Sequence, residues 1–321
     1  MPRFFSFLYM AMLLNWLRFI LFPLACLYDG LTRLRNRLYD AKLKKSHSFP
    51  RLLLVSVGNL SVGGTGKSPL VEYVVRLLQA QNKTVATLSR GYGRKTRGFL
   101  QAIPQSQAQD IGDEPLQFYQ KFYPHLPVFV GEKRAEALAK IALQMPAVDT
   151  VVLDDAFQHR AVRPDVNILV TTFASPFFAD WLLPTGTLRE SRSEANRADL
   201  VVVSKCPPTL TTEQKNTYLR QIYRYCSPNT PVFFCQIDYL PLQPVFNQTP
   251  AAPALLPKQH GIILLTGIAQ STPLVTYISQ QATLLKHYAF ADHHAFSESE
   301  IEAVCHYYDS QSAPTLIICT I

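Results

Sequence analysis

The stretch VGNLSVGGTGKSP, residues 57–69, decides the fold, because it sets four glycines, a lysine and two serines between an apolar run and an apolar-periodic one. A phosphate-binding loop needs backbone N–H groups that point at phosphate oxygens where a helix begins, and glycines leave room for that approach. Lys67 would then reach the β- and γ-phosphates of a nucleotide, and the Ser68 hydroxyl would bind Mg²⁺. The residues predicted to hold the phosphates are Gly63, Gly64, Thr65, Gly66, Lys67 and Ser68.

One position of this loop departs from the pattern G-x-x-x-x-G-K-[ST]. Ser61 stands where the first glycine is expected, and Gly58 lies three residues earlier. The sequence leaves open whether Ser61 or Gly58 shapes the loop. A glycine-rich turn without a ligand is the alternative, but a strand before the loop and a helix after it favour the P-loop.

Short β-branched runs alternate with helical patterns from residue 51 onward, which is typical of a doubly wound α/β domain. Residues 52–58 and 84–90 are predicted strands on either side of a helix at 68–81, and residues 150–155, 166–172 and 198–205 are further buried strands. A proline-rich region at 228–257 interrupts the alternation, and a smaller α/β domain is expected after it. We predict a membrane-associated segment at 1–45, a P-loop NTPase-like kinase domain at 46–232, and a linker with the smaller domain at 233–321.

Two acids end a predicted buried strand in the stretch TVVLDD, residues 150–155. Asp154 and Asp155 therefore stand where a Walker-B-type carboxylate meets Mg²⁺, although one of them could instead cap a helix. The stretch VVVSKCP, residues 201–207, lacks the acid that a guanine-reading N-K-x-D loop supplies. ATP is therefore the expected nucleotide.

The N-terminal segment at residues 4–28 is apolar and carries one charge, Arg18, before Pro23 interrupts its helical pattern. As a helix, residues 4–22 would extend about 28 Å, close to the roughly 30 Å of a hydrocarbon core. Asn15 and Arg18 share one helical face, which favours a helix embedded in one leaflet over a spanning one. A signal peptide is the competing interpretation, but export would separate the P-loop from cytosolic ATP.

The chain has 48% hydrophobic and 17% charged residues and a net charge of +8, and its excess of basic residues has a clear place. Seven lysines and arginines lie between residues 29 and 51, directly after the apolar segment, as expected near anionic lipid heads on the cytoplasmic side of a membrane. The six cysteines show no metal-type spacing, so we expect reduced thiols. No nucleic-acid partner is expected.

Six motifs in order resemble the tetraacyldisaccharide 4'-kinases, the lipid A 4'-kinases of the Gram-negative inner membrane. They are SVGGTGKSP (61–69), LSRGYGR (88–94), GDEP (112–115), LDDAFQHR (153–160), LLPTGTLRE (182–190) and FADHHAF (290–296). The resemblance covers nearly the whole chain. It implies transfer of the γ-phosphate of ATP, with Mg²⁺, to the 4'-hydroxyl of an acylated glucosamine disaccharide 1-phosphate at the cytoplasmic face of the inner membrane, giving lipid IVA.

The resemblance also implies roles for individual residues. Asp113 and His293 resemble the catalytic pair, with Asp113 as the base on the sugar hydroxyl and His293 tuning it. His294 stays an alternative to His293, which is preferred because it directly follows Asp292. The residues that resemble the metal site are Ser68, Asp154, Asp155 and Glu190, and the expected substrate-binding residues are Arg90, Arg94, Gln158, His159 and Arg189.

Two other functions compete with a lipid kinase. A membrane-associated P-loop ATPase acting on a protein partner would position water and need no histidine from a second domain. A membrane-anchored binding module without turnover would not be expected to keep Lys67, Asp154 and Asp113 together. No obligate protein partner is expected, and the sequence gives no indication of acyl-chain specificity.

Overall fold

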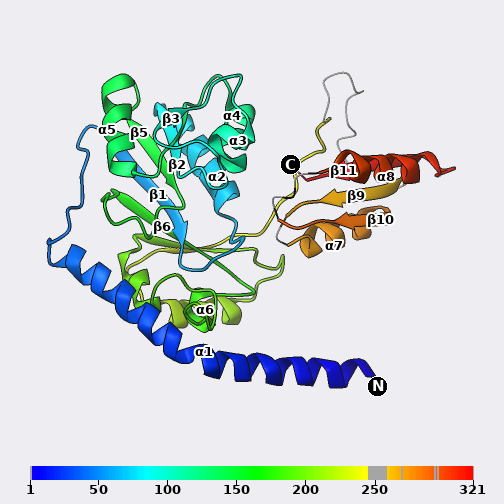
Figure 1. Cartoon of the computed structure of the whole chain (residues 1–321), viewed down its shortest axis with the longest axis horizontal. Coiled ribbons are helices and arrows are strands. Elements are labelled where there is room, and N and C mark those ends of the chain that lie inside the picture. Colours follow the sequence, from blue (N-terminus) through cyan, green and yellow to red (C-terminus); the bar gives the residue numbers. More distant parts are fainter. Residues whose placement is uncertain (1, 245–258, 269, 293, 295, 321) are drawn as a thin grey trace. The chain divides into compact units, whose positions relative to one another are not determined.

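The computed structural model describes residues 2–244, 259–268, 270–292, 294 and 296–320, with the backbone alone for residues 2–17. The chain divides into two compact units, Met1–Ile237 and Asp238–Ile321 (Figure 1). The division falls inside the proline-rich region. Each unit is built around its own sheet.

The sheet of the first unit has eight strands in the order β3-β4-β2-β5-β1-β6-β7-β8, and only β3 is antiparallel to its neighbour. In this order β1 is central, between β5 and β6, so Val57 pairs with both Asp154 and Ile168. The strands are β1 (Leu53–Asn59), β2 (Val85–Ser89), β3 (Leu100–Gln101), β4 (Val128–Val130), β5 (Thr150–Asp154), β6 (Val166–Thr172), β7 (Leu200–Ser204) and β8 (Val232–Phe234).

Helices cover both faces of this sheet because its strands are apolar on both sides. Val55 and Val57 of β1 pack in one core with α2 and α4, whereas Leu54 packs in another with α5. Figure 1 shows α5 on one side of the sheet and α2, α3 and α4 on the other. The predicted α/β class with a large parallel sheet is confirmed. The helices are α2 (Lys67–Ala80), α3 (Ala108–Ile111), α4 (Asp113–Phe122), α5 (Arg134–Gln144), α6 (Thr212–Ile222) and the 3₁₀ turns Phe177–Ala179 and Arg192–Arg197.

The N-terminal helix α1 (Pro2–Asp40) is longer than the sequence pattern predicts, because it continues through Pro23. Its buried residues Ala25 and Asn36 lie eleven positions apart, about three turns, and so share one face. Its exposed apolar residues are Phe19, Ile20, Phe22, Leu24, Leu27, Leu31 and Leu34. Across the described part of the chain, no helix combines the length and the apolar character that a membrane crossing needs.

The second unit is a three-stranded parallel sheet in the order β10-β9-β11. Ile262 and Leu264 of the central strand pack with Ile278 of α7, and its alternate residue Ile263 packs with Val304 of α8. This unit is therefore a small α/β layer structure of its own. Its elements are β9 (Gly261–Thr266), α7 (Thr272–Gln281), β10 (Thr283–Ala289), α8 (Glu298–Asp309) and β11 (Thr315–Cys319).

Candidate active site

The P-loop follows β1 and leads into α2, and its glycines have distinct tasks. Gly63 and Gly66 adopt φ values of +99° and +83°, a region that side chains other than glycine rarely enter. Gly58 has a different task, because a Cβ added there would lie 2.7 Å from the Cβ of Phe157. Ser61 forms an isolated antiparallel bridge with Leu188 and is buried. Serine thus replaces the first glycine of the pattern at a paired position, and Gly58 serves packing of the strand end rather than the loop.

The loop is held from two strand ends. Asn59, at the end of β1, donates its amide to the Thr65 hydroxyl over 2.9 Å. Ser204, at the end of β7, donates its hydroxyl to the carbonyl oxygen of Thr65 over 2.7 Å, and the next residue, Lys205, donates to the carbonyl oxygen of Gly64 over 2.6 Å. The sequence suggested Lys205 only as part of a stretch that cannot read guanine, so its contact with the P-loop is new.

Asp154 ends β5 beside the P-loop strand and is fully enclosed, with 2% of its surface exposed. Burial, together with the neighbouring charges of Glu114 and Asp155, raises its pKa to about 7. Its Oδ1 atom is buried without a hydrogen-bond partner. An uncompensated carboxylate oxygen of this kind is a costly feature that a bound cation would relieve.

Asp155 has the opposite electrostatic environment. Burial raises the pKa of its carboxyl, but the hydrogen bonds of Arg189 and the charges of Lys67, Arg189 and Arg134 outweigh that effect and hold the pKa below its usual value. Arg189 donates to both carboxylate oxygens over 2.8 and 3.0 Å, and the Lys67 ammonium lies 3.8 Å from Oδ1. Asp155 is thus an ionised partner of two cations at the P-loop.

Glu114 is a site residue that sequence reasoning missed. The Ser68 hydroxyl donates to Glu114 Oε1 over 2.6 Å, which joins the start of α4 to the start of α2. The signal was present in GDEP, where Glu114 directly follows Asp113, but only one acid of that motif was considered. Asp113 is the first residue of α4 and is exposed.

Arg134, at the start of α5, is a second missed residue. Its guanidinium donates to the carbonyl oxygens of Asp154 over 2.7 Å and of Asp155 over 3.1 Å, and only 3% of the residue is exposed. Asp155 adopts a φ of +45°, which is unusual for a residue other than glycine. Arg134 therefore fixes a strained turn that places both acids. No sequence motif around Arg134 predicts this role.

The oxygen atoms beside the P-loop fit Mg²⁺, which prefers oxygen ligands and usually keeps waters and substrate phosphates among them. Ser68, Asp154 and Glu114 offer oxygen atoms only. Within the described residues, no group of three or more His, Cys, Asp or Glu side chains is arranged to hold a metal by itself. The side chains of Ser68, Asp154 and Glu114 would form a Mg²⁺ site together with waters and nucleotide phosphates.

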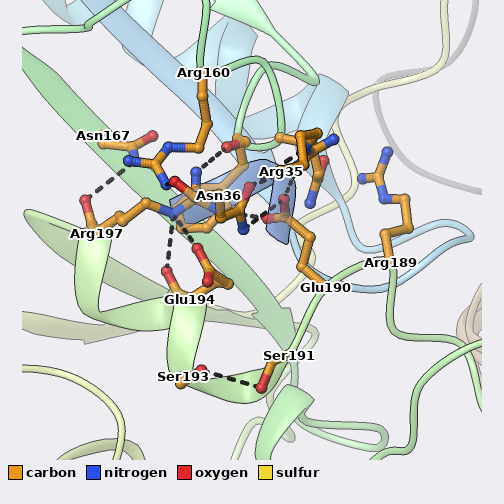
Figure 2. Close-up of polar contacts among 12 residues, drawn as sticks. Arg35, Asn36, Arg160, Asn167, Arg189, Glu190, Ser191, Ser193, Glu194 and Arg197 are labelled. Carbon is orange, nitrogen blue, oxygen red and sulfur yellow. Dashed lines mark hydrogen bonds and ion pairs between the residues drawn. The ribbon is translucent and has the colours of Figure 1, made fainter. Parts of the chain in front are cut away.

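Glu190, which the resemblance places at the metal, is engaged by three other side chains in this structure. Its Oε1 accepts hydrogen bonds from the guanidinium of Arg35 and from the Asn36 amide, and its Oε2 accepts from Arg197. Figure 2 shows Glu190 directed at Arg35 and Asn36, while the neighbouring Arg189 side chain points away from them. We call Arg35, Asn36, Glu190 and Arg197 the Glu190 cluster. Because three donors already engage its carboxylate, Glu190 serves this cluster.

The predicted substrate-binding residues have different surroundings. Gln158 donates to the carbonyl oxygen of Asn59 over 2.7 Å and so supports the end of β1. Burial, together with the charges of Arg134, Arg90 and Arg35, lowers the pKa of His159 to about 4, so this imidazole is neutral at physiological pH.

The two remaining arginines border a basic hollow of about 450 Å³ that Tyr92, Lys95 and Arg97 also line. Arg90 is exposed, whereas the Arg94 side chain is enclosed and donates to Glu132 and to the carbonyl oxygen of Gly98. Arg94 therefore stabilises the loop at residues 94–98 rather than pointing at a ligand.

Of the two histidines of FADHHAF, the structure describes only His294. His293 lies outside the described residues. The His294 ring stacks on Phe290, and its Nε2 lies 2.9 Å from a carboxylate oxygen of Glu300 at the start of α8. His294 is thus part of the N-terminal cap of α8.

The chain is similar to proteins of one family over almost its whole length. A family model described as "Tetraacyldisaccharide-1-P 4'-kinase" matches residues 17–320. Two proteins named "Tetraacyldisaccharide 4'-kinase", from Flavobacterium johnsoniae and Bacteroides thetaiotaomicron, are 42% and 38% identical over 91% and 88% of this chain and 83% and 76% of their own lengths. A crystal structure of LpxK from Aquifex aeolicus in complex with ATP matches with a TM-score of 0.72 and 28% identity, over 95% of this chain and 88% of that one.

Proposed function

Since the chain belongs to the tetraacyldisaccharide-1-P 4'-kinase family, we propose how its residues and its N-terminal helix divide the work of that reaction. The chain is an ATP-dependent kinase of lipid A biosynthesis, and it transfers the γ-phosphate to the 4'-hydroxyl of an acylated disaccharide 1-phosphate. These roles rest mainly on one observation: Lys67 and Arg189 both pair with Asp155 at the P-loop.

The P-loop half of the site binds the phosphates of ATP. The backbone between Gly63 and Ser68 surrounds them at the start of α2, and Lys67 neutralises charge on the β- and γ-phosphates. Arg189 contributes a second cation near Lys67, because both pair with Asp155. The nucleotide-bound crystal structure from Aquifex aeolicus supports this half of the proposal.

The metal would be held by Ser68, Asp154 and Glu114, which offer oxygen ligands beside the P-loop. When bound, Mg²⁺ supplies positive charge that neutralises the phosphate oxygens during transfer. The raised pKa of Asp154 and its unpartnered Oδ1 support its assignment as a ligand. Arg134, which donates to the carbonyl oxygen of Asp154, keeps this acid in place.

The acceptor half consists of Asp113 and His293. Asp113 takes the proton of the 4'-hydroxyl as its oxygen bonds to the γ-phosphorus and the bond from that phosphorus to the β-phosphate oxygen breaks, releasing ADP. The exposure of Asp113 at the start of α4 supports access by a substrate. The motif FADHHAF, which this chain shares with the family that it resembles, is the basis for proposing His293 as the histidine that tunes Asp113. Arg90 and the basic hollow beside it would bind the 1-phosphate.

The N-terminal helix would hold the enzyme at the cytoplasmic face of the inner membrane. Ile20, Leu24, Leu27, Leu31 and Leu34 recur at spacings of four and three residues, so they form one stripe, and at least half of each is exposed. The basic residues Arg37, Lys42, Lys44 and Lys45 follow this stripe along the chain and suit anionic lipid heads. An exposed apolar stripe beside positive charge supports an interfacial helix.

A double charge substitution in this stripe tests the membrane proposal. Leu27→Glu/Leu31→Glu is expected to lower the partition coefficient onto anionic vesicles by at least about 100-fold, since burying the two leucines stabilises by roughly 3–6 kcal/mol in all. Flotation with vesicles of mixed zwitterionic and anionic lipid measures this. Tyr73→Glu/Leu77→Glu on α2 is the matched control, because these residues are also exposed and apolar. Equal flotation of the two double variants would contradict the proposal.

A further inference from the structure

Residues 187–191 lie alongside the entry to the P-loop. The backbone N–H of Val62 donates to the carbonyl oxygen of Thr187 over 2.8 Å, and that of Arg189 donates to the carbonyl oxygen of Leu60 over 2.7 Å. Between these bonds, Ser61 and Leu188 form a β-bridge. A shift of this segment would therefore shift the start of the loop.

The side chain of Arg189 connects this segment to the residues beside the P-loop. Its guanidinium binds both oxygens of Asp155 and also donates to the side-chain and backbone oxygens of Asn59. Asn59 in turn donates to the Thr65 hydroxyl of the P-loop. Arg189 thus holds the strand end, the acid and the loop together.

The opposite side of the same segment is held by α1. Tyr28 donates its hydroxyl to the carbonyl oxygen of Arg189 over 2.9 Å, and Arg35 and Asn36 donate to the Glu190 carboxylate. Two consecutive residues, Arg189 and Glu190, are therefore fixed by three side chains that span about two turns of the helix. The segment lies between α1 and the P-loop.

The burial of Glu190 makes this contact sensitive to the position of α1. Glu190 has 0% exposed surface, and a buried carboxylate that loses one of its cations is strongly destabilised. Arg197 engages only Oε2, so the charge on Oε1 is compensated by Arg35 and Asn36 of α1. Displacement of α1 would leave half of this carboxylate buried without a partner, and the 187–191 segment would have to move.

From this arrangement we infer that α1 is a positioning element of the active site: through Tyr28 and the Glu190 cluster it sets the position of Arg189. The helix then has two functions on separate faces, an apolar stripe for lipid and a polar face for the kinase core. A membrane-bound α1 and a correctly placed Arg189 are parts of one rigid connection. The inference rests on the proposed role of Arg189 at the phosphates.

Kinetics in detergent micelles test this inference, because micelles supply the lipid substrate without a need for membrane anchoring. Arg35→Ala is expected to lower kcat for lipid phosphorylation about 10- to 100-fold, the range expected for a small misplacement of a catalytic group, with KM for the lipid nearly unchanged. Arg220→Ala is the control, since it removes an exposed arginine from another helix, α6, and is expected to leave kcat unchanged. Arg35→Lys should restore part of the loss.

The same Arg35→Ala substitution, made in a protein that already carries Arg189→Ala, separates an effect on the position of Arg189 from an effect on folding. If Arg35 acts through Arg189, then Arg35→Ala should lower kcat no further in a protein that already carries Arg189→Ala. Rates are expressed per ATP-binding site, measured by titration with labelled ATP, so that unfolded protein does not count. Tyr28→Phe, which removes one hydroxyl, is a milder variant expected to lower kcat a few-fold.

The outcomes distinguish the inference from the function on which it rests. If Arg189→Ala lowers kcat but Arg35→Ala and Tyr28→Phe do not, the inference is wrong and the site assignment stands. An equal loss from Arg35→Ala in both backgrounds also overturns it, because the helix would then act by another route. If Arg189→Ala leaves kcat unchanged, the proposed role of Arg189 fails first.

Discussion

Asp113→Asn is expected to lower kcat for lipid phosphorylation about 10²- to 10⁴-fold, the usual contribution of a general base, while the affinity for ATP changes little. Asparagine keeps the shape of the side chain and removes its ability to take a proton. Lys67 pairs with Asp155 and Ser68 donates to Glu114, and both contacts remain in this variant, so nucleotide binding should persist. Initial rates and a binding titration with ATP measure the two quantities.

Asp110→Asn is the matched control for this variant. Asp110 lies three residues earlier and accepts a hydrogen bond from the Gln107 backbone, a bond that an asparagine oxygen can also accept. His293→Ala should share much of the defect of Asp113→Asn, whereas His294→Ala should mainly weaken the cap of α8. A fall in ATP affinity as large as the fall in kcat would show that Asp113 serves nucleotide binding.

Asp154→Asn is expected to make the protein free of nucleotide and metal more stable and nearly inactive. Burial raises the pKa of Asp154 to about 7, so the folded state binds a proton more tightly than the unfolded state does. Stability from this group is therefore full below its unfolded pKa of about 3.9, falls as the pH rises toward 7, and is absent above 7. The neutral asparagine should raise the free energy of unfolding at pH 8 by on the order of 2–4 kcal/mol.

Denaturant unfolding at pH 8 and at pH 4.5 measures this effect. The gain of the variant over the wild type should be large at pH 8 and small at pH 4.5, because most Asp154 carboxyls in the folded wild type are protonated at the lower pH. Asp165→Asn, at a carboxylate that accepts from the Leu54 backbone, is a control that should show no such gain. An Asp154→Asn protein less stable than the wild type at pH 8 would refute the account of this acid.

Local patterns in the sequence predict much of the P-loop half of the site. The P-loop, the flanking strand and helix, and the acids at the end of β5 were identified because each depends on a few neighbouring residues with a set spacing. The role of Ser61 needed the structure, since its partner Leu188 is remote in sequence.

The rest of the site depends on contacts that no local spacing encodes. Arg35 and Glu190 are separated by 155 positions, so the cluster that they form has no signature in either segment. The resemblance places Glu190 at the metal, whereas its hydrogen bonds with Arg35, Asn36 and Arg197 are visible only in the structure. Arg134 is one arginine on a helix until the fold brings it to the carbonyl groups of Asp154 and Asp155.

The central claim is that this site phosphorylates a lipid at the 4'-hydroxyl. Purified protein in detergent, given ATP labelled at the γ-phosphate, Mg²⁺ and the acylated disaccharide 1-phosphate, tests it most directly. The account predicts label on the lipid at the 4'-position, in equal amount to the ADP formed. Label found only as free phosphate, with none on the lipid, would contradict it and favour an ATPase.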